Sequence, residues 1–281
     1  MTVDVNTDII ARYLLTGSAD LYGGRWAKTF IENERAGSTA LKSALIEEIR
    51  RLTQGMSIRP ARGDDGDRRA LVRQRVEPMV RGLFSVNEQD IVLDVLVRCF
   101  VFVDAENIET LVREARWLST AWMLANLYLE GAGAELLSAE APRLVGYSEE
   151  TTCYVGQSYW SSSGPLEDFI VHEAAHVFHN CRRSAVELSE TRRHEWLLNV
   201  DYHMRETFAY ACEAYRRLIE YPVRATRREF LETLPPRADP PDDRVDADEW
   251  RDILCEALAA RNGWKRILAR CARPPGSRPR A

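Results

Sequence analysis

Apolar residues recur at intervals of three and four along most of the first half of the chain. This spacing predicts helices around Asp8 to Leu15, Thr39 to Leu52 and Arg69 to Phe84. Residues 57–68 are rich in arginine, aspartate and glycine, which predicts a loop before the third helix. The first half is therefore expected to be helical, and it contains no cluster of chemically reactive side chains.

Two further helices are expected before residue 135. Ser85 and Glu88 form a capping-box signature that opens the apolar segment Ile91 to Val103. One longer helix is expected next, and it ends at Gly131 and Gly133. Its apolar face is formed by Ile108, Leu111, Val112, Ala115, Leu118, Trp122, Ala125 and Leu129.

The pattern changes near residue 143. Leu144 to Ser148 and Thr151 to Trp160 are rich in β-branched and aromatic residues and are joined by an acidic turn, which predicts an antiparallel pair of strands. Gly156 indicates a bulge or the close approach of another backbone. Pro165 then suits the first position of a helix. A small antiparallel sheet followed by a helix is expected here.

Helices are expected again after residue 200, at about Asp201 to Tyr221 and Ala225 to Leu234. Residues 235–248 have the composition of a linker, and a helix from roughly Asp248 to Asn262 follows. The chain from Trp264 onward is basic and is expected to be a solvated tail, disordered at its end. The fold class that we predict is α+β and predominantly helical.

Composition narrows the possible functions. The 281 residues include 38 lysines and arginines against 43 acidic residues, a formal net charge of −5, and basic residues are not interleaved with aromatic ones. This argues against nucleic-acid binding. Six cysteines without a CxxC pair indicate reduced thiols, no secretory signal is evident, and no apolar run reaches the ~20 residues of a membrane span. We therefore expect a cytoplasmic protein that does not enter a membrane; the sequence gives no indication of its oligomeric state.

The reactive side chains lie in the second half, where all five histidines fall between positions 172 and 203. His172, Glu173 and His176 form an HExxH motif. Residues four apart lie on one face of a helix, so two imidazoles can bind one metal ion while Glu173 faces a water on it. An open tetrahedral site of this kind suits zinc. Residues 169–178 are apolar except at the motif, which predicts a buried helix. The motif itself predicts one zinc ion per chain.

Glu206 is the third ligand that the sequence favours. Glu206, Tyr210 and Glu213 share one face of a predicted helix, and Glu206 can face His172 and His176 from it. The apolar face of that helix is formed by Phe208, Ala211, Cys212, Tyr215, Leu218 and Ile219. Three other residues remain alternatives for this ligand: His194, His203 and Asp201.

HExxH with a glutamate on a later helix resembles the gluzincin clan of zinc metallopeptidases, which has a zincin-like fold. The resemblance covers roughly residues 105–222. It implies that His172, His176 and Glu206 bind zinc and that Glu173 is the general base, taking the proton of a water that attacks a peptide carbonyl. The preceding strand would offer an edge to an extended peptide. The segment around Glu206 is also similar to bacterial regulatory metallopeptidases that cut repressors.

Other clans fit the sequence less well. The metzincin pattern requires a glycine at position 179 and a histidine at position 182, where this chain has His179 and Arg182. Peptide deformylases use an upstream cysteine ligand, but Cys153 lacks their flanking sequence. His179 is expected to support the site rather than to bind the metal. The residue that stabilises the oxyanion stays open among five candidates: Tyr210, His194, His203, Tyr154 and Tyr159.

Three regions are expected on this basis: a helical N-terminal region, 1–103; a zincin-like metallopeptidase region, 104–234; and a linker, C-terminal helix and basic tail, 235–281. The expected function is zinc-dependent hydrolysis of a peptide bond in an intracellular protein or peptide. The alternative is a regulatory, partner-binding protein with a structural or vestigial zinc site. Glu173 argues against that alternative, because a closed structural site does not need a general base.

Overall fold

The structure, a computed structural model, describes residues 5–57, 63–161, 164–191, 194–235, 240 and 242–272. These residues are mostly helical and include one small mixed sheet, in agreement with the predicted α+β class. None of the helices within these ranges is both long and apolar enough to cross a membrane. Parts of the expected loop 57–68 and linker 235–248, and the end of the basic tail, lie outside the described residues.

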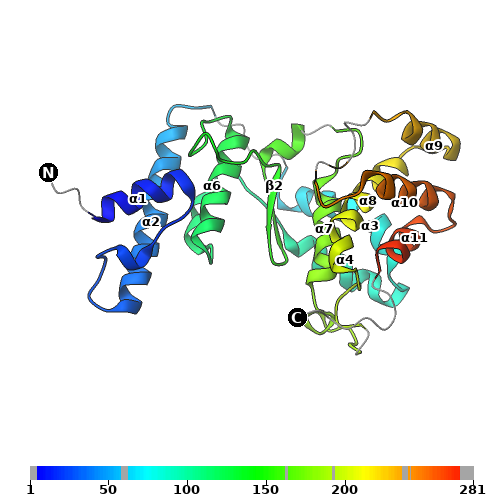
Figure 1. Cartoon of the computed structure of the whole chain (residues 1–281), viewed down its shortest axis with the longest axis horizontal. Coiled ribbons are helices and arrows are strands. Elements are labelled where there is room, and N and C mark those ends of the chain that lie inside the picture. Colours follow the sequence, from blue (N-terminus) through cyan, green and yellow to red (C-terminus); the bar gives the residue numbers. More distant parts are fainter. Residues whose placement is uncertain are drawn as a thin grey trace. The chain divides into compact units, whose positions relative to one another are not determined.

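Two compact units make up the chain, and they interleave along the sequence (Figure 1). Unit 1 comprises Met1–Asp64, Val101–Glu149 and Tyr154–Ser161, and unit 2 comprises Asp65–Phe100, Glu150–Cys153 and Ser162–Ala281. The regions expected from the sequence were contiguous instead. Each unit is described by itself below.

Unit 1 is formed by helices and a small sheet. Its helices are α1 (Val5–Thr16), α2 (Phe30–Thr53), α5 (Ile108–Glu114) and α6 (Leu118–Ala132), with short 3₁₀ helices at Leu21–Gly23 and Gln157–Ser161. Its strands are β1 (Phe100–Phe102), β2 (Gly146–Glu149) and β3 (Thr152–Val155), of which β1 and β3 begin in unit 2.

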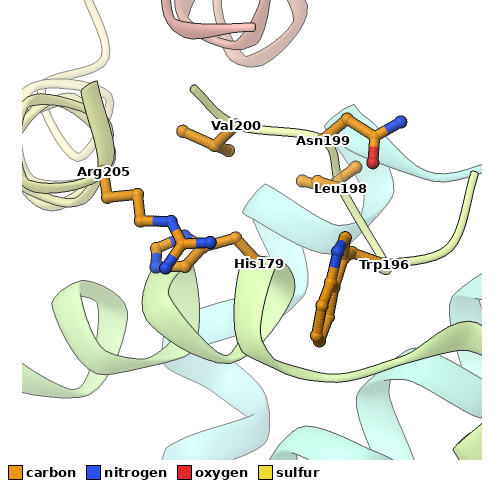
Figure 2. A pocket seen from close by; sticks show the side chains of 6 residues that line it. All are labelled: His179, Trp196, Leu198, Asn199, Val200 and Arg205. Carbon is orange, nitrogen blue, oxygen red and sulfur yellow. The ribbon is translucent and has the colours of Figure 1, made fainter. Parts of the chain in front are cut away.

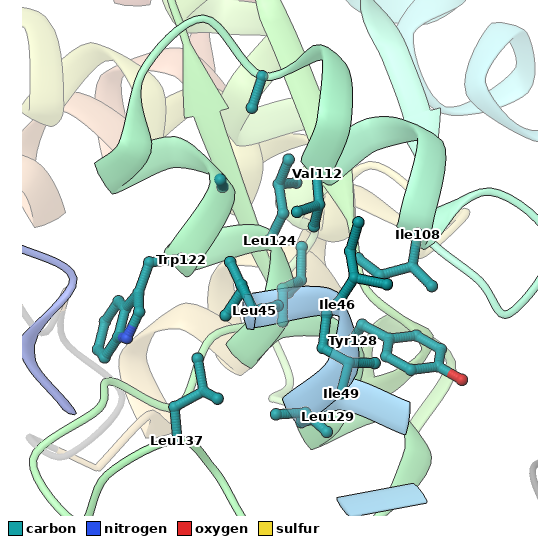
Figure 3. Packing of buried hydrophobic residues seen from close by; sticks show 14 of the residues in the cluster. Leu45, Ile46, Ile49, Ile108, Val112, Trp122, Leu124, Tyr128, Leu129 and Leu137 are labelled. Carbon is teal, nitrogen blue, oxygen red and sulfur yellow. The ribbon is translucent and has the colours of Figure 1, made fainter. Parts of the chain in front are cut away.

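The core of unit 1 lies between α2, α5 and α6 (Figure 3). Leu45 and Ile49 lie one turn apart on α2, and they pack in one cluster with Leu124 and Val112. Two hydrogen bonds attach α1 to α6: the Tyr13 hydroxyl donates to the carbonyl of Leu118 at 2.8 Å, and the Trp122 indole donates to the carbonyl of Leu14 at 2.9 Å.

The long helix expected after residue 104 is in fact two helices, α5 and α6, which are separated by residues 115–117. Lys42 of α2 donates hydrogen bonds to the carbonyls of Arg113 and Ala115 at 3.0 and 2.6 Å, and so satisfies groups that a continuous helix would pair internally. The apolar period continues across the break, which is why the sequence did not reveal it. The predicted end of the helix is confirmed at Gly133, which adopts the left-handed conformation with φ of 71°.

The sheet has the order β1-β3-β2 and is mixed, so the expectation of a purely antiparallel sheet was wrong. The predicted pair corresponds to β2 and β3. The third strand, β1, comes from the end of the apolar segment that was expected to be entirely helical, because three apolar residues do not distinguish strand from helix. The expected close approach at Gly156 is confirmed: its N–H donates to the carbonyl of Val145 at 2.9 Å, and a Cβ there would lie 2.7 Å from Leu127.

Unit 2 is almost entirely helical. Its helices are α3 (Asp65–Leu83), α4 (Val86–Cys99), α7 (Phe169–Asn180), α8 (Arg205–Leu218), α9 (Arg224–Thr233), α10 (Ala247–Ala259) and α11 (Gly263–Cys271). Short 3₁₀ helices lie at Arg183–Val186 and Tyr202–Met204. α8 packs against α7, α10 and α11, and is therefore central in this unit.

Helix α7 begins later than expected. Pro165 lies in a turn, and the first helical residue is Phe169. Asp168 directly precedes the helix, and its carbonyl accepts the N–H groups of Val171 and His172, both at 3.0 Å. Aspartate is one of the residues preferred directly before the first helical residue, so Asp168 also marked this boundary in the sequence.

The start of the basic tail is a helix, α11, and not a solvated segment. Trp264, Ile267 and Cys271 are buried at intervals of three and four residues. The ring of Trp264 packs edge-on against Tyr215 of α8, with the ring centroids 4.8 Å apart. A Cβ at Gly82 of α3 would lie 2.2 Å from Trp264, so the glycine is required for this packing. The basic residues of the segment led to the expectation of a solvated tail, although its apolar residues have helical spacing.

Candidate metal centre

Helix α7 carries the HExxH motif on the one side that is not fully buried. Six of its apolar residues are buried: Ile170, Val171, Ala174, Ala175, Val177 and Phe178. The three motif residues His172, Glu173 and His176 are half-buried. The expected burial of this helix is confirmed, and the polar side chains that remain can face a ligand.

The three expected ligand residues come together in space. One ligand atom each from His172, His176 and Glu206 lies within 4.8 Å of the others, and no other group of this kind occurs among the described residues. Nε2 of His176 lies 3.1 Å from Nε2 of His172, and Oε2 of Glu206 lies 3.4 and 3.8 Å from these two atoms. Tetrahedral zinc with bonds of about 2.0–2.1 Å separates its ligand atoms by roughly 3.3 Å. The donor set therefore fits a zinc ion.

Glu213 orients His172 from helix α8. Its Oε2 lies 3.1 Å from Nδ1 of His172, and its Oε1 accepts the backbone N–H of Asp168. The Glu213 side chain is 9% exposed. A carboxylate on Nδ1 leaves Nε2 of the ring free to bind a metal, which is the common arrangement of metal-ligating histidines.

His179 contacts His176 in the same way as Glu213 contacts His172, at the ring nitrogen Nδ1. Its Nε2 lies 3.2 Å from Nδ1 of His176, and the residue is only 3% exposed. Burial, followed by the charges of His176, Arg205 and His172, lowers the pKa of His179 to about 2. A neutral His179 can accept a hydrogen bond from His176, in line with the supporting role expected for it.

Arg244 holds the third carboxylate. Its Nη2 lies 3.1 Å from Oε1 of Glu206, so Oε2 is the atom left facing the two histidines. Asp242 fixes the guanidinium through contacts of 2.6 Å to Nη2 and 2.9 Å to Nε. The short segment that contains Asp242 and Arg244 thereby lies at the third ligand.

The electrostatics keep Glu206 in the form that binds a metal. Burial raises the pKa of this carboxyl, but the hydrogen bond from His176 and the charges of His176, His172 and Arg244 outweigh burial, and the pKa is lowered. Burial likewise lowers the pKa of His172, while Glu213, Glu173 and Glu206 raise it, with a net increase. Three carboxylates therefore surround this histidine, and the site as a whole attracts a cation.

The alternatives for the third ligand lie elsewhere. His194 is exposed and pairs with Thr191, and the exposed His203 packs against the ring of Tyr202. Asp201 accepts the N–H of His203 at the start of a 3₁₀ helix. None of the three belongs to the ligand group.

Among the residues considered for stabilising the oxyanion, Tyr210 lies next to the proposed metal ligands. Its ring packs edge-on against His172, with the centroids 4.5 Å apart. Burial and the nearby carboxylates of Glu213, Asp242 and Glu206 raise the pKa of Tyr210 to about 12, so the phenol keeps its proton. Tyr154 and Tyr159 belong to unit 1.

Two residues of the site were missed by the sequence analysis. The spacing placed Glu213 on the same face as Glu206 and Tyr210, and the usual pairing of metal-bound histidines with carboxylates could have identified its role. Arg244 gave no such signal, because it follows Glu206 by 38 positions, across a segment with linker composition.

Comparisons with known proteins identify no relative of this chain. The chain matches no protein-family model, no curated protein and no solved structure.

Proposed function

We propose that this protein is a zinc-dependent metallopeptidase that hydrolyses a peptide bond in an intracellular protein or peptide. One observation carries the proposal. Each of the three residues that could bind the ion is held by a different partner: His172 by Glu213, His176 by His179 and Glu206 by Arg244. Such partners orient ligands and tune them for a metal.

A zincin-like arrangement is part of the proposal. It is supported by the packing of α7, which carries HExxH, against α8, which carries the third carboxylate. Three protein ligands in a tetrahedral site leave a fourth position for water or substrate, as in catalytic rather than structural zinc sites.

Bound zinc would supply Lewis acidity to a water and to the substrate carbonyl. Glu173 lies beside the ligands, and its charge acts on His172. In our proposal Glu173 takes the proton of the attacking water and delivers it to the leaving amine. Tyr210, with its ring against His172, is the donor we favour for the developing oxyanion.

The test is Glu173→Gln, which removes the base but no proposed ligand. We expect the variant to keep its zinc and to hydrolyse a peptide pool ~10²–10⁴-fold more slowly than the wild type. Glu229→Gln, at an exposed position of α9, removes the same charge from unit 2 and should leave the rate unchanged.

Product formation is followed by mass spectrometry, beside the metal content of each protein. Full activity in Glu173→Gln would exclude Glu173 as the base. If the wild type bound zinc but cleaved no peptide, the alternative of a structural or vestigial zinc site in a regulatory protein would be favoured.

A further inference from the structure

The guanidinium of Arg244 lies next to the proposed metal ligands and is open to solvent. Its Nη2 lies 3.1 Å from Oε1 of Glu206, whose other oxygen, Oε2, faces His172 and His176. The Arg244 side chain is 69% exposed. One residue of an extended chain spans ~3.3–3.6 Å. A substrate group that reaches Arg244 from the metal position therefore belongs to a residue directly beside the bond that is cleaved.

Arg244 is held in place along one edge of its guanidinium. Asp242 accepts hydrogen bonds from Nε at 2.9 Å and from Nη2 at 2.6 Å. Within the described part of the chain, the hydrogen bonds and ion pairs of Arg244 involve Nε and Nη2, which leaves the two N–H groups of Nη1 to a ligand or to water. A guanidinium that a neighbour already fixes loses little conformational freedom when it binds a ligand.

The chemistry of this group favours a carboxylate as its ligand. Hydrogen bonds between a guanidinium and a carboxylate are charge-assisted and are stronger than those to neutral acceptors. Arg244 already contacts two carboxylates, those of Asp242 and Glu206. Because Glu206 is the proposed third ligand, a bound divalent ion would take up much of its charge. Arg244 can then neutralise a further carboxylate, supplied by the substrate.

A second arginine, Arg205, directly precedes Glu206 but is less suited to bind a substrate. It extends from the start of α8 toward His179 and lines a small pocket (Figure 2). The pocket has a volume of about 40 Å³, which is room for a few water molecules at about 10–15 Å³ each and not for a residue of a peptide. Neither Arg244 nor any of the three proposed ligands lines it. The exposed Arg244 is therefore the better placed of the two arginines to contact a peptide.

We propose that Arg244 determines which peptides are cleaved, by binding through Nη1 a carboxylate on the residue beside the scissile bond. The proposal rests on the metallopeptidase function proposed above. Two kinds of peptide carry such a carboxylate: one whose C-terminal residue directly follows the scissile bond, and one with an aspartate or glutamate beside that bond. Both present the same chemistry to Arg244, and the test distinguishes them.

Three libraries of random hexapeptides separate these two sources. The first has a free C-terminal carboxylate and contains no aspartate or glutamate. The second has a C-terminal amide and contains both acidic residues, and the third has a C-terminal amide and contains neither. Cleavage by protein of determined zinc content is followed by mass spectrometry. Equilibrium dialysis of the same libraries against zinc-loaded Glu173→Gln measures binding without cleavage.

We expect the wild type to cleave, and Glu173→Gln to bind, peptides of the first or the second library about 10–100-fold better than those of the third, which is the effect of a charge-assisted hydrogen bond. Arg244→Gln should reduce this ratio to near one, both alone and combined with Glu173→Gln. Loss of zinc alone would slow the cleavage of all three libraries equally and keep the ratio. Arg244→Lys, which keeps a charge beside Glu206 but lacks the guanidinium, should also lower the ratio. Arg228→Gln on α9, which breaks an exposed pair with Glu232, is the matched control and should not change it.

The outcomes distinguish this proposal from the proposed function. Equal cleavage of all three libraries by the wild type, or an unchanged ratio in Arg244→Gln, would overturn the role of Arg244 and leave the peptidase standing. Binding of acidic peptides that depends on Arg244, without any cleavage by the wild type, would support the carboxylate site and contradict the peptidase. Neither cleavage nor binding of any library would contradict both.

Discussion

Glu213 links the start of helix α7 to the proposed ligand His172, and a single substitution tests this link. The two carboxylate oxygens of Glu213 contact the N–H of Asp168 and the ring of His172. A glutamine side chain has only one acceptor oxygen, so it cannot accept from both groups. We expect Glu213→Gln to weaken zinc binding ~10–100-fold. The metal-free protein should lose about 1–3 kcal/mol of stability, because one buried group is left unpaired.

Zinc competition and urea unfolding measure these two effects, with Glu229→Gln as the exposed control. Zinc affinity equal to that of the wild type would mean that Glu213 does not orient the ligand. A loss of stability without a loss of affinity would assign Glu213 to the cap of α7 alone.

At this scale the sequence predicted the ligand group better than its surroundings. Helical spacing relates His172 to His176, but Glu206 reaches them through the packing of α8 against α7, so the sequence favoured Glu206 while three alternatives stayed open. The contact of Arg244 with Glu206 depends instead on the path of the chain between α8 and α10. No local pattern encodes such a path.

The first turn of helix α4 also contacts a loop of unit 2, through Glu88 and Arg183. The N–H of Ser85 donates to Oε2 of Glu88 at 3.2 Å, which confirms the predicted capping box. Oε1 of Glu88 pairs with Arg183, which is 8% exposed and donates to the carbonyl of Ser189 at 2.8 Å. One carboxylate therefore caps a helix and neutralises an almost buried arginine.

Glu88→Gln should destabilise the protein by roughly 2–4 kcal/mol at pH 7, because it weakens the cap and leaves Arg183 without its counter-charge. Burial raises the pKa of Glu88, but hydrogen bonds from Arg183 and Ser85 outweigh burial and lower it. The stabilisation by this carboxylate is thus present above the pKa of an unfolded glutamate, ~4.3, and is lost as the pH falls through the lowered value in the fold.

Urea unfolding at pH 7 and pH 3 checks this prediction. Glu77→Gln is the control, because its pair with Arg81 has a 2.6 Å contact but lies on the surface and should contribute less than about 1 kcal/mol. Equal effects of the two substitutions at pH 7 would contradict the account of Glu88, and so would a larger effect of Glu88→Gln at pH 3 than at pH 7.

Most helices were predictable as elements, and their exact ends were not. Periodicity located α1 to α4 and α8 to α10. The break between α5 and α6 was invisible because it is stabilised by Lys42, a residue of another helix, and β1 was invisible because it continues an apolar run. Contacts that are distant in sequence decided both features.

For the whole molecule, the sequence predicted a mostly helical α+β protein but not its division into two interleaved units. Unit 1 is built from three separate segments of the chain, and composition does not indicate where the chain passes from one unit to the other. The whole candidate metal centre, including Glu213, His179 and Arg244, belongs to unit 2. Unit 2 in turn includes α11, which net charge had assigned to a solvated tail.

The metal content of the full-length protein tests the central claim most directly. The wild type and Glu206→Ala are purified without added metal and compared by elemental analysis, with Glu229→Gln as a control for charge. We predict about one zinc per chain in the wild type and in the control, and loss or strong depletion in Glu206→Ala. A wild type that contains no zinc even after supplementation, or a Glu206→Ala variant that retains the full amount, would contradict the proposed centre.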